Sequence, residues 1–466
     1  RNLWTMQGRT RNAVLRLKQK APEKYLEYQE LEADLKKFDK QKPKELGQFS
    51  TLTELGHADA PPTYVLFKGI YDRKLDEVQP GVPALFSDHQ PEVTPTPTSS
   101  GRRTALANWI VDPKNPLTAR VFVNRVWGTY FGKAIVETVQ DFGKMSAKPT
   151  NPELLDYLAD SFVHDGNWSI KALQKQILLS ATYRQSSAYR EDADKVDPQN
   201  KLLASFPRQR LDAEQIRDSL LYAAGLLDET LGGQPVYPPQ PNFANQAGFN
   251  ENTWKTSENP RDQNRRSVYI YVKRNTPYPL LDTFDWANPQ SVHGKREVTT
   301  TAPQALALIN NDLVYGWSQV LAGRAIREGG EKEEKRVARL FEILYSREPS
   351  KDETKTLIAF LDSQEKLLAA QLAEGKKIVA PDGYGADPKV GVELDQLYHT
   401  LYGRGADRYE KAALVTFVEK QQKPAKADDA AKPKADAAID PHAARAAAFV
   451  DLAHALANSN EFSYRF

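Results

Sequence analysis

Apolar residues recur at the three- and four-residue spacing of an α-helix in one segment after another, from residue 102 to the end of the chain. Pro, Gly and Asp-Pro breaks separate these segments. The pattern predicts helices over residues 105–111, 118–131, 152–165, 170–182, 207–227, 303–327, 331–344, 351–373 and 442–459. Because each amphipathic helix must bury its apolar stripe against a neighbour, the series predicts a mainly α fold, a multi-helix bundle with a small β element and long ordered loops.

The clearest of these helices is predicted over Pro207–Leu227. Asp212 can cap its first turn, with Gln215 three residues later as in a capping box. Its apolar stripe consists of Ile216, Leu220, Ala223 and Leu227. We expect this helix to be a strut that holds the aromatic segment after Gly233 in place.

Two short runs, 63–69 and 267–272, have the Tyr, Val and Ile content of β-strands. We expect them to form the small β element, and pairing between them is one arrangement. The chain then divides into a helical spacer or arm (1–60), a short strand with an extended connector (61–100), a main helical domain (101–330) with an aromatic and basic loop insertion (232–300), and a C-terminal helical region (331–466) with a flexible low-complexity loop (420–440).

Charge and residue content exclude several classes of function. With 63 basic and 61 acidic residues, the chain has no overall field to attract nucleic acid or an anionic membrane. The absence of cysteine excludes a thiol nucleophile, a disulfide, a Cys zinc site and Cys-linked haem. The seven histidines lack metal-helix spacing, and no apolar run has the roughly 18 residues of a transmembrane segment. We expect no metal and no cofactor in this chain, although haem on an upstream region or a partner is compatible with it.

Three carboxylates are candidates for acid–base chemistry. Glu214 and Asp218 lie one turn apart on the predicted 207–227 helix, with Arg217 between them, and Asp285 lies further along the chain. Paired carboxylates in a pocket can transfer protons or hold a cation. The competing interpretation, which we favour, is that these groups pair with arginines and support the helix. A buried Arg217 that bridges helices would be one version of it.

Aromatic and basic residues are interleaved through 237–296, together with amides such as Asn242 and Asn250. Aromatic rings offer flat apolar faces, and guanidinium groups pair with carboxylate, sulfate or phosphate. The ligand-binding candidates are Trp254, Arg265, Arg266, Arg274, Trp286 and Arg296. The same composition would suit a loop that packs onto the helical bundle with buried rings and ion pairs.

Several phrases of the sequence together resemble one family. They are PPTYVLFKGIYD at Pro61, EVQPGVPA at Glu77, LANWIVDPKNPLTARVFVNRVWGTYFG at Leu106, NPELLDYLA at Asn151, SATYRQSS at Ser180, RLDAEQIRD at Arg210, RRSVYIYVKRNTPYPLLDTFD at Arg265 and TTAPQALALINN at Thr300. The family is an exported domain of unknown function found chiefly in Planctomycetes. The resemblance implies a domain that follows a cytochrome-c-like region and a second uncharacterised domain in large secreted or surface proteins. It also implies a periplasmic, cell-surface or extracellular location, and we expect the chain to be a piece of such a protein.

These observations predict a non-catalytic binding or assembly module of a large exported, cytochrome-associated bacterial protein, with protein partners. Two alternatives stay open. One is a hydrolase or lyase acting on anionic, for example sulfated, polysaccharide, and the other is a scaffold subunit of an electron-transfer complex. An open cleft lined by Trp254, Trp286 and Arg266, with two carboxylates a few ångströms apart, would favour the hydrolase or lyase alternative, whereas rings packed inward would count against any sugar-binding role.

Overall fold

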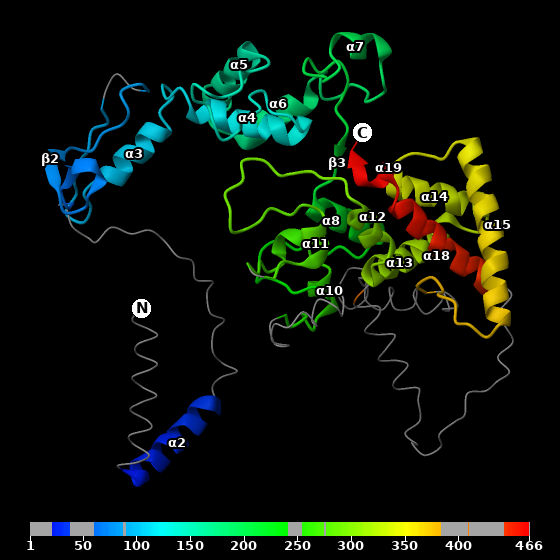
Figure 1. Ribbon diagram of the computed structural model, residues 1–466. Helices are drawn as coiled ribbons and strands as arrows, with labels where there is room; N and C mark the ends of the chain where they lie inside the picture. Colours follow the sequence, from blue (N-terminus) through cyan, green and yellow to red (C-terminus); the bar gives the residue numbers. More distant parts are fainter. Residues whose placement is uncertain are drawn as a thin grey trace. The chain divides into compact units, whose positions relative to one another are not determined.

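The computed structural model describes residues 21–37, 60–86, 90–240, 254–274, 276–383, 409 and 442–465 (Figure 1). The predicted loop at 420–440 lies outside the described residues, as does most of the predicted spacer. The chain divides into two compact units, one ending at Asp112 and the other beginning at Pro113. Helices dominate the described residues and strands are few and short, which confirms the mainly α fold with a small β element. No helix in these ranges is long and apolar enough to cross a membrane.

The first unit contains a two-stranded antiparallel hairpin. Strand β1 (Thr63–Leu66) pairs with β2 (Lys74–Val78), and a short 3₁₀ turn, η2 (Phe67–Gly69), begins the connection. The predicted strand at the start of 63–69 is therefore confirmed. Its partner is a nearby segment that we expected to be an extended connector. Helices α2 (Pro22–Lys37) and α3 (Arg102–Ile110) also belong to this unit.

The second unit contains two hydrophobic cores, the first built by three predicted helices. They are α4 (Thr118–Phe131), α5 (Pro152–Val163) and α6 (Ile170–Leu179), followed by the short α7 (Glu191–Val196). The apolar stripe of each helix faces the same core, and its members include Val123, Trp127, Phe131, Leu155, Leu158, Phe162, Leu173 and Ile177. The fully buried Asn124 fixes the chain after α4, because its amide donates to the Val136 carbonyl at 3.0 Å and accepts the Val136 N–H at 2.8 Å.

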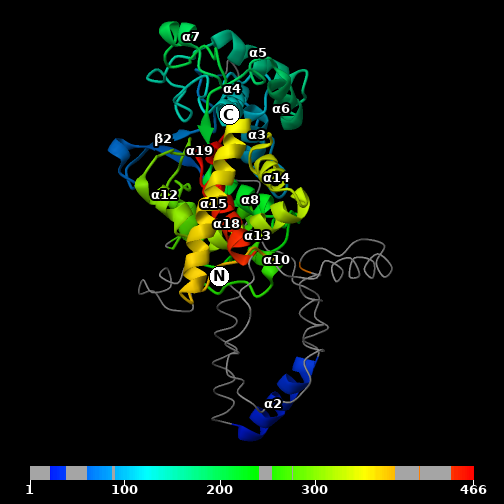
Figure 2. The same ribbon diagram turned by 90° about the vertical axis from the view of Figure 1, so that its right-hand side faces the viewer.

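The second core is larger and gathers helices from distant parts of the sequence. These are α8 (Ala213–Ala223), α11 (Pro279–Thr283), α12 (Ala302–Ile309), α13 (Asp312–Gly329), α14 (Glu333–Tyr345), α15 (Lys351–Ala373), α18 (Ala443–Ala457) and α19 (Asn460–Ser463). The short helix α10 (Pro260–Gln263) is held to α8 by a hydrogen bond from Arg217 to the Gln263 carbonyl. Helix α18 packs against both α13 and α15. In Figures 1 and 2, α13 and α15 run alongside α18. Phe449 and Leu452 are buried and Leu456 packs against them, which confirms that the last long helix docks on the bundle.

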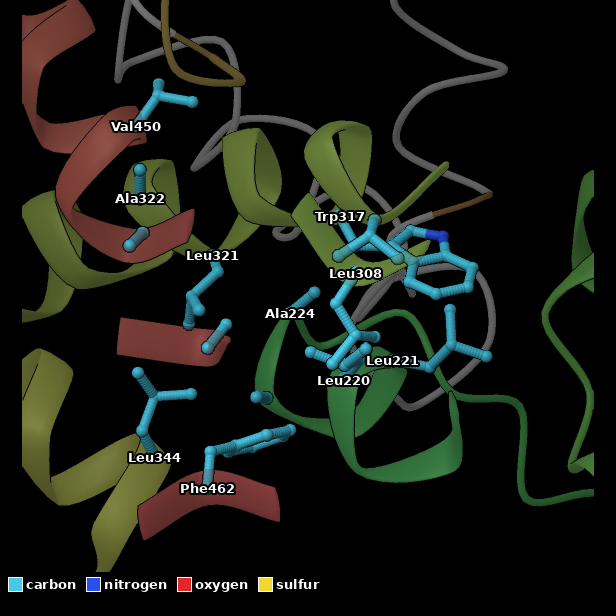
Figure 3. Packing of buried hydrophobic residues seen from close by; sticks show 14 of the residues in the cluster. Leu220, Leu221, Ala224, Leu308, Trp317, Leu321, Ala322, Leu344, Val450 and Phe462 are labelled. Carbon is cyan, nitrogen blue, oxygen red and sulfur yellow. The ribbon is translucent and has the colours of Figure 1, made fainter. Parts of the chain in front are cut away.

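Helix α8 lies inside this core with one face covered. Asp212 and Gln215 form the predicted capping box, and the predicted stripe of Ile216, Leu220 and Ala223 is buried. In Figure 3, Leu220, Leu221 and Ala224 lie among Leu308, Trp317, Leu321 and Phe462. The helix ends at Ala223, short of the predicted Leu227, because Gly225 takes a left-handed conformation with φ 69°. Before α8, β3 (Gln209–Arg210) pairs antiparallel with β4 (Tyr464–Arg465).

Two other sequence predictions were wrong in detail. The 267–272 run is not a strand: Ser267–Tyr269 forms the 3₁₀ turn η3, and Ile270 makes a single parallel bridge with Val236. The predicted helix over 303–327 is two helices, α12 and α13. Asn311 separates them, because its side chain accepts the Leu313 N–H at 2.9 Å and starts a new helix as an N-cap.

Candidate functional site

The exposed face of α8 lines an open groove of about 1070 Å³, which we call the α8 groove. The buried stripe of α8 faces the core, so its opposite, largely polar face is left to line this groove. The other walls come from the end of α14, from the α19–β4 segment and from the turn before and within η3. The lining residues are Leu211, Glu214, Gln215, Asp218, Ser219, Tyr222, Ala223, Leu227, Arg266, Val268, Ile343, Leu344, Tyr345, Ser346, Arg347, Glu461, Phe462 and Tyr464.

Glu214 forms an ion pair with an arginine from the loop that precedes α12. Arg296 donates from both terminal nitrogens to the two Glu214 oxygens, with Nη2 to Oε1 at 2.8 Å. Burial raises the pKa of Glu214, but the hydrogen bonds from Arg296 and a smaller one from the Trp286 side chain outweigh it and leave that pKa below its ordinary value. The structure thus brings together three residues that the sequence had assigned to different roles.

The Asp218 carboxylate accepts hydrogen bonds from the turn that follows α10. Its carboxylate accepts the Ser267 N–H at 2.8 Å and the Ser267 hydroxyl at 2.6 Å. Arg217 Nη1 lies 3.5 Å from the same carboxylate. Asp218 therefore holds the first residue of η3, and the N–H of that residue is satisfied by this carboxylate and not by a neighbouring strand.

Arg217 is fully buried and binds the same turn. Its guanidinium donates to the carbonyls of Gln263 at 2.8 Å and Arg265 at 3.0 Å, and to the Ser267 hydroxyl at 3.1 Å. This is the bridging arginine that the sequence suggested. Burial lowers the pKa of Arg217, and the nearby Tyr278 and Asp218 only partly oppose the shift.

Arg266 lies between these two anchors and reaches the α8 groove. Arg217 fixes the carbonyl of the residue before it, and Asp218 fixes the N–H of the residue after it. Its own side chain is exposed and has no hydrogen bond or ion pair with any residue that the structure describes. Arg266 is therefore a cation on an anchored backbone, open to a ligand in the groove.

The far wall of the groove carries a second arginine, Arg347, that already has partners. It bridges Glu461 and Glu353, with Nε to Glu461 at 2.6 Å and Nη2 to Glu353 at 2.7 Å. Arg347 and Glu461 were not among the residues predicted from the sequence. They lie 114 residues apart and no local pattern links them.

Trp254 and Arg265, two of the predicted ligand-binding residues, lie away from the groove. Trp254 is 8% exposed, stacks on Tyr278, and donates its indole N–H to the Pro238 carbonyl at 2.8 Å. Arg265 is also buried, lies over the Tyr269 ring at 3.9 Å, and donates to backbone carbonyls of the 230–234 loop. Both side chains thus hold the segment after α8 onto the bundle.

Arg274 and Asp285 complete the predicted set. The Arg274 side chain is exposed and does not line the α8 groove. Asp285 accepts from Arg210 Nη2 at 2.6 Å and from the N–H and hydroxyl of Thr299 at 2.8 and 2.7 Å. Its oxygens are therefore occupied by an internal network near the start of α12.

The α8 groove thus collects carboxylates that already accept hydrogen bonds. Glu214 accepts from Arg296, Asp218 from Ser267, and Glu461 from Arg347. In the described part of the chain, no group of three or more His, Asp or Glu side chains is placed to hold a metal ion. Arg266 is the charged side chain of the groove that has no partner among the described residues, so the arrangement suits recognition of an anionic ligand.

The described residues form a mainly helical protein with an open, partly polar groove on one helix. A family model with the description "PSD1: Protein of unknown function (DUF1553)" matches residues 102–361, more than half of the chain, so the chain belongs to this family. No curated protein and no solved structure matches the chain significantly.

Proposed function

We propose that the chain is a non-catalytic binding module and that the α8 groove is its binding site. The observation that carries the proposal is the contrast between paired and unpaired charges in the groove. Its three carboxylates accept hydrogen bonds from neighbouring groups, whereas Arg266 has no partner among the described residues. A free cation on an anchored backbone supports ligand recognition, because pairing it with an anion displaces no existing ion pair.

The hydrolase alternative has less support from the same geometry. A general acid needs a carboxyl group whose pKa is raised toward neutrality. The pKa of Glu214 is shifted the other way, since the hydrogen bonds from Arg296 outweigh its burial. Trp254 packs into the core and offers no ring face for sugar stacking.

The location and the partners of the module are part of the same proposal. The motifs quoted above resemble exported, cytochrome-associated proteins of Planctomycetes, and on that resemblance we propose an extracytoplasmic assembly with protein partners. An electron-transfer scaffold would be one form of such an assembly, with the haem on another region or another chain.

Arg266→Glu is expected to release the partners of the module. The test is affinity purification of the whole native protein from its own cells, with quantitative mass spectrometry of the chains that co-purify. The variant reverses the free charge of the groove, so we expect recovery of the main partner to fall about tenfold or more.

Arg184→Glu is the matched control, because Arg184 is an exposed arginine outside the groove. This substitution changes the net charge of the chain by the same amount as Arg266→Glu. It is expected to keep the partners. Recovery of the unaltered protein as a lone monomer would refute the assembly role, and equal loss in both variants would show that net charge, and not the α8 groove, holds the partner.

A further inference from the structure

We infer that the ligand of the α8 groove is an extended peptide segment with an acidic side chain, and that Arg266 binds the carboxylate of that side chain. This inference rests on the proposed function and adds the chemical class of the ligand. It follows from the length of the groove, from the chemistry of its floor, which is the α8 face, and of its other walls, and from the position of Arg266.

The groove follows α8 from end to end. Its lining residues on this helix run from Glu214 to Ala223, at the spacing of one helix face. The 11 residues of α8 span about 16 Å at the usual rise per residue. An extended chain covers that distance with about five residues. A short peptide segment therefore fits the groove lengthwise.

The floor and the walls differ in chemistry. The floor presents the Ser219 hydroxyl and the Gln215 amide, whose Oε1 caps the helix by accepting the Asp212 N–H at 2.9 Å. The other walls present apolar groups, including Val268, which is 70% exposed, and Phe462, beside the ion-paired Arg347 and Glu461. A peptide carries polar backbone groups at every residue together with side chains, so it can use a polar floor and an apolar wall at once.

Among the described charged residues that line the groove, only Arg266 is without a partner, so the groove favours one acidic group on the ligand, at Arg266. The negative charge of Glu214 is offset by Arg296, and Arg347 lies between Glu461 and Glu353. A cationic group on the ligand would find Glu214 already bound to Arg296, and Glu461 and Glu353 already sharing Arg347. A guanidinium binds a carboxylate through two parallel hydrogen bonds, and the fixed backbone of residues 265–267 reduces the entropy lost on pairing.

The test is a direct binding measurement with the full chain and synthetic probes. A fluorescein-labelled peptide of alternating Glu and Leu is titrated and its fluorescence anisotropy recorded, beside a Gln and Leu peptide and a labelled heparin fragment. We expect saturable binding of the Glu peptide, at least about tenfold weaker binding of the Gln peptide, and a loss of about tenfold or more with Arg266→Glu. Arg184→Glu is expected to bind like the unaltered chain, and circular dichroism checks that both variants are folded.

The outcomes separate the inference from the proposed function. If heparin binds and the Glu peptide does not, with the heparin signal lost in Arg266→Glu, the peptide inference is wrong while the groove stays a binding site. If the Glu and Gln peptides bind equally, the carboxylate contact is wrong. If no probe binds, yet Arg266→Glu still loses the partner in cells, the ligand class is wrong and the proposed function stands. If no probe binds and the partner is also retained, both are overturned.

Discussion

Replacing Arg217 by Ala is expected to lower the free energy of unfolding by about 3–5 kcal/mol. The side chain is fully buried and donates to two backbone carbonyls and to the Ser267 hydroxyl. Its removal leaves the carbonyls of Gln263 and Arg265 without these donors inside the protein, and it also opens a cavity. Urea unfolding followed by tryptophan fluorescence measures the effect, since the Trp317 ring lies 5.9 Å from the Arg217 guanidinium.

Two further variants make this experiment specific. Arg217→Lys keeps a positive charge but loses the planar fork, so we expect it to recover only a minor part of the stability. Arg266→Ala removes an arginine from the same turn that is exposed and unpaired among the described residues, and it is expected to change stability by less than about 0.5 kcal/mol. A loss below about 1 kcal/mol in Arg217→Ala would contradict the anchoring role.

Local sequence patterns predicted the helices well because their signals lie within a few residues. The capping box of Asp212 and Gln215 and the stripe of Ile216 and Leu220 are both contained in α8. Such signals act before distant parts of the chain come together, so they can be read from one sequence. The same holds for the docking of the last long helix, whose apolar face contains Phe449 and Leu452.

The β-run at 267–272 was misassigned because a distant side chain decides its conformation. Val, Tyr and Ile favour a strand where a neighbouring strand can accept the backbone. Here the N–H and the hydroxyl of Ser267 bind the Asp218 carboxylate, 49 residues earlier, and the chain turns. Composition alone cannot show such a partner.

The candidate site was predictable only in part for the same reason. Glu214, Asp218 and Arg266 do share the α8 groove, but the sequence could not distinguish the exposed Arg266 from the buried Arg265 beside it. Neighbouring residues in an irregular segment point in directions that tertiary contacts select. The wall formed by Arg347 and Glu461 depends on the same kind of long-range contact.

Replacing Asp285 by Asn is expected to destabilise the protein by about 2–3 kcal/mol at neutral pH. Asp285 pairs with Arg210, whose side chain is only 6% exposed, so the substitution leaves a buried cation without its carboxylate. Asp285 has a φ of 61°, in the left-handed region, and Asn tolerates that conformation about as well as Asp. Asp285→Asn therefore removes the negative charge without adding backbone strain. Asp285→Ala is expected to cost about 1 kcal/mol more, because it adds the backbone strain.

The pH dependence of this effect has a definite sign. Burial raises the pKa of Asp285, but hydrogen bonds from Thr299 and Arg210 outweigh it and hold the folded-state pKa below the ordinary value of 3.8. A carboxyl group whose pKa is lower in the folded state stabilises the protein above its unfolded-state pKa, and this stabilisation is lost as the pH falls through the folded-state pKa. The stability difference between the unaltered chain and Asp285→Asn should therefore be constant from pH 7 down to about pH 5 and shrink below about pH 4. Urea unfolding across this range measures it. A difference that stays constant at low pH, or that grows, would show that the Arg210–Asp285 pair does not stabilise the fold through its charge.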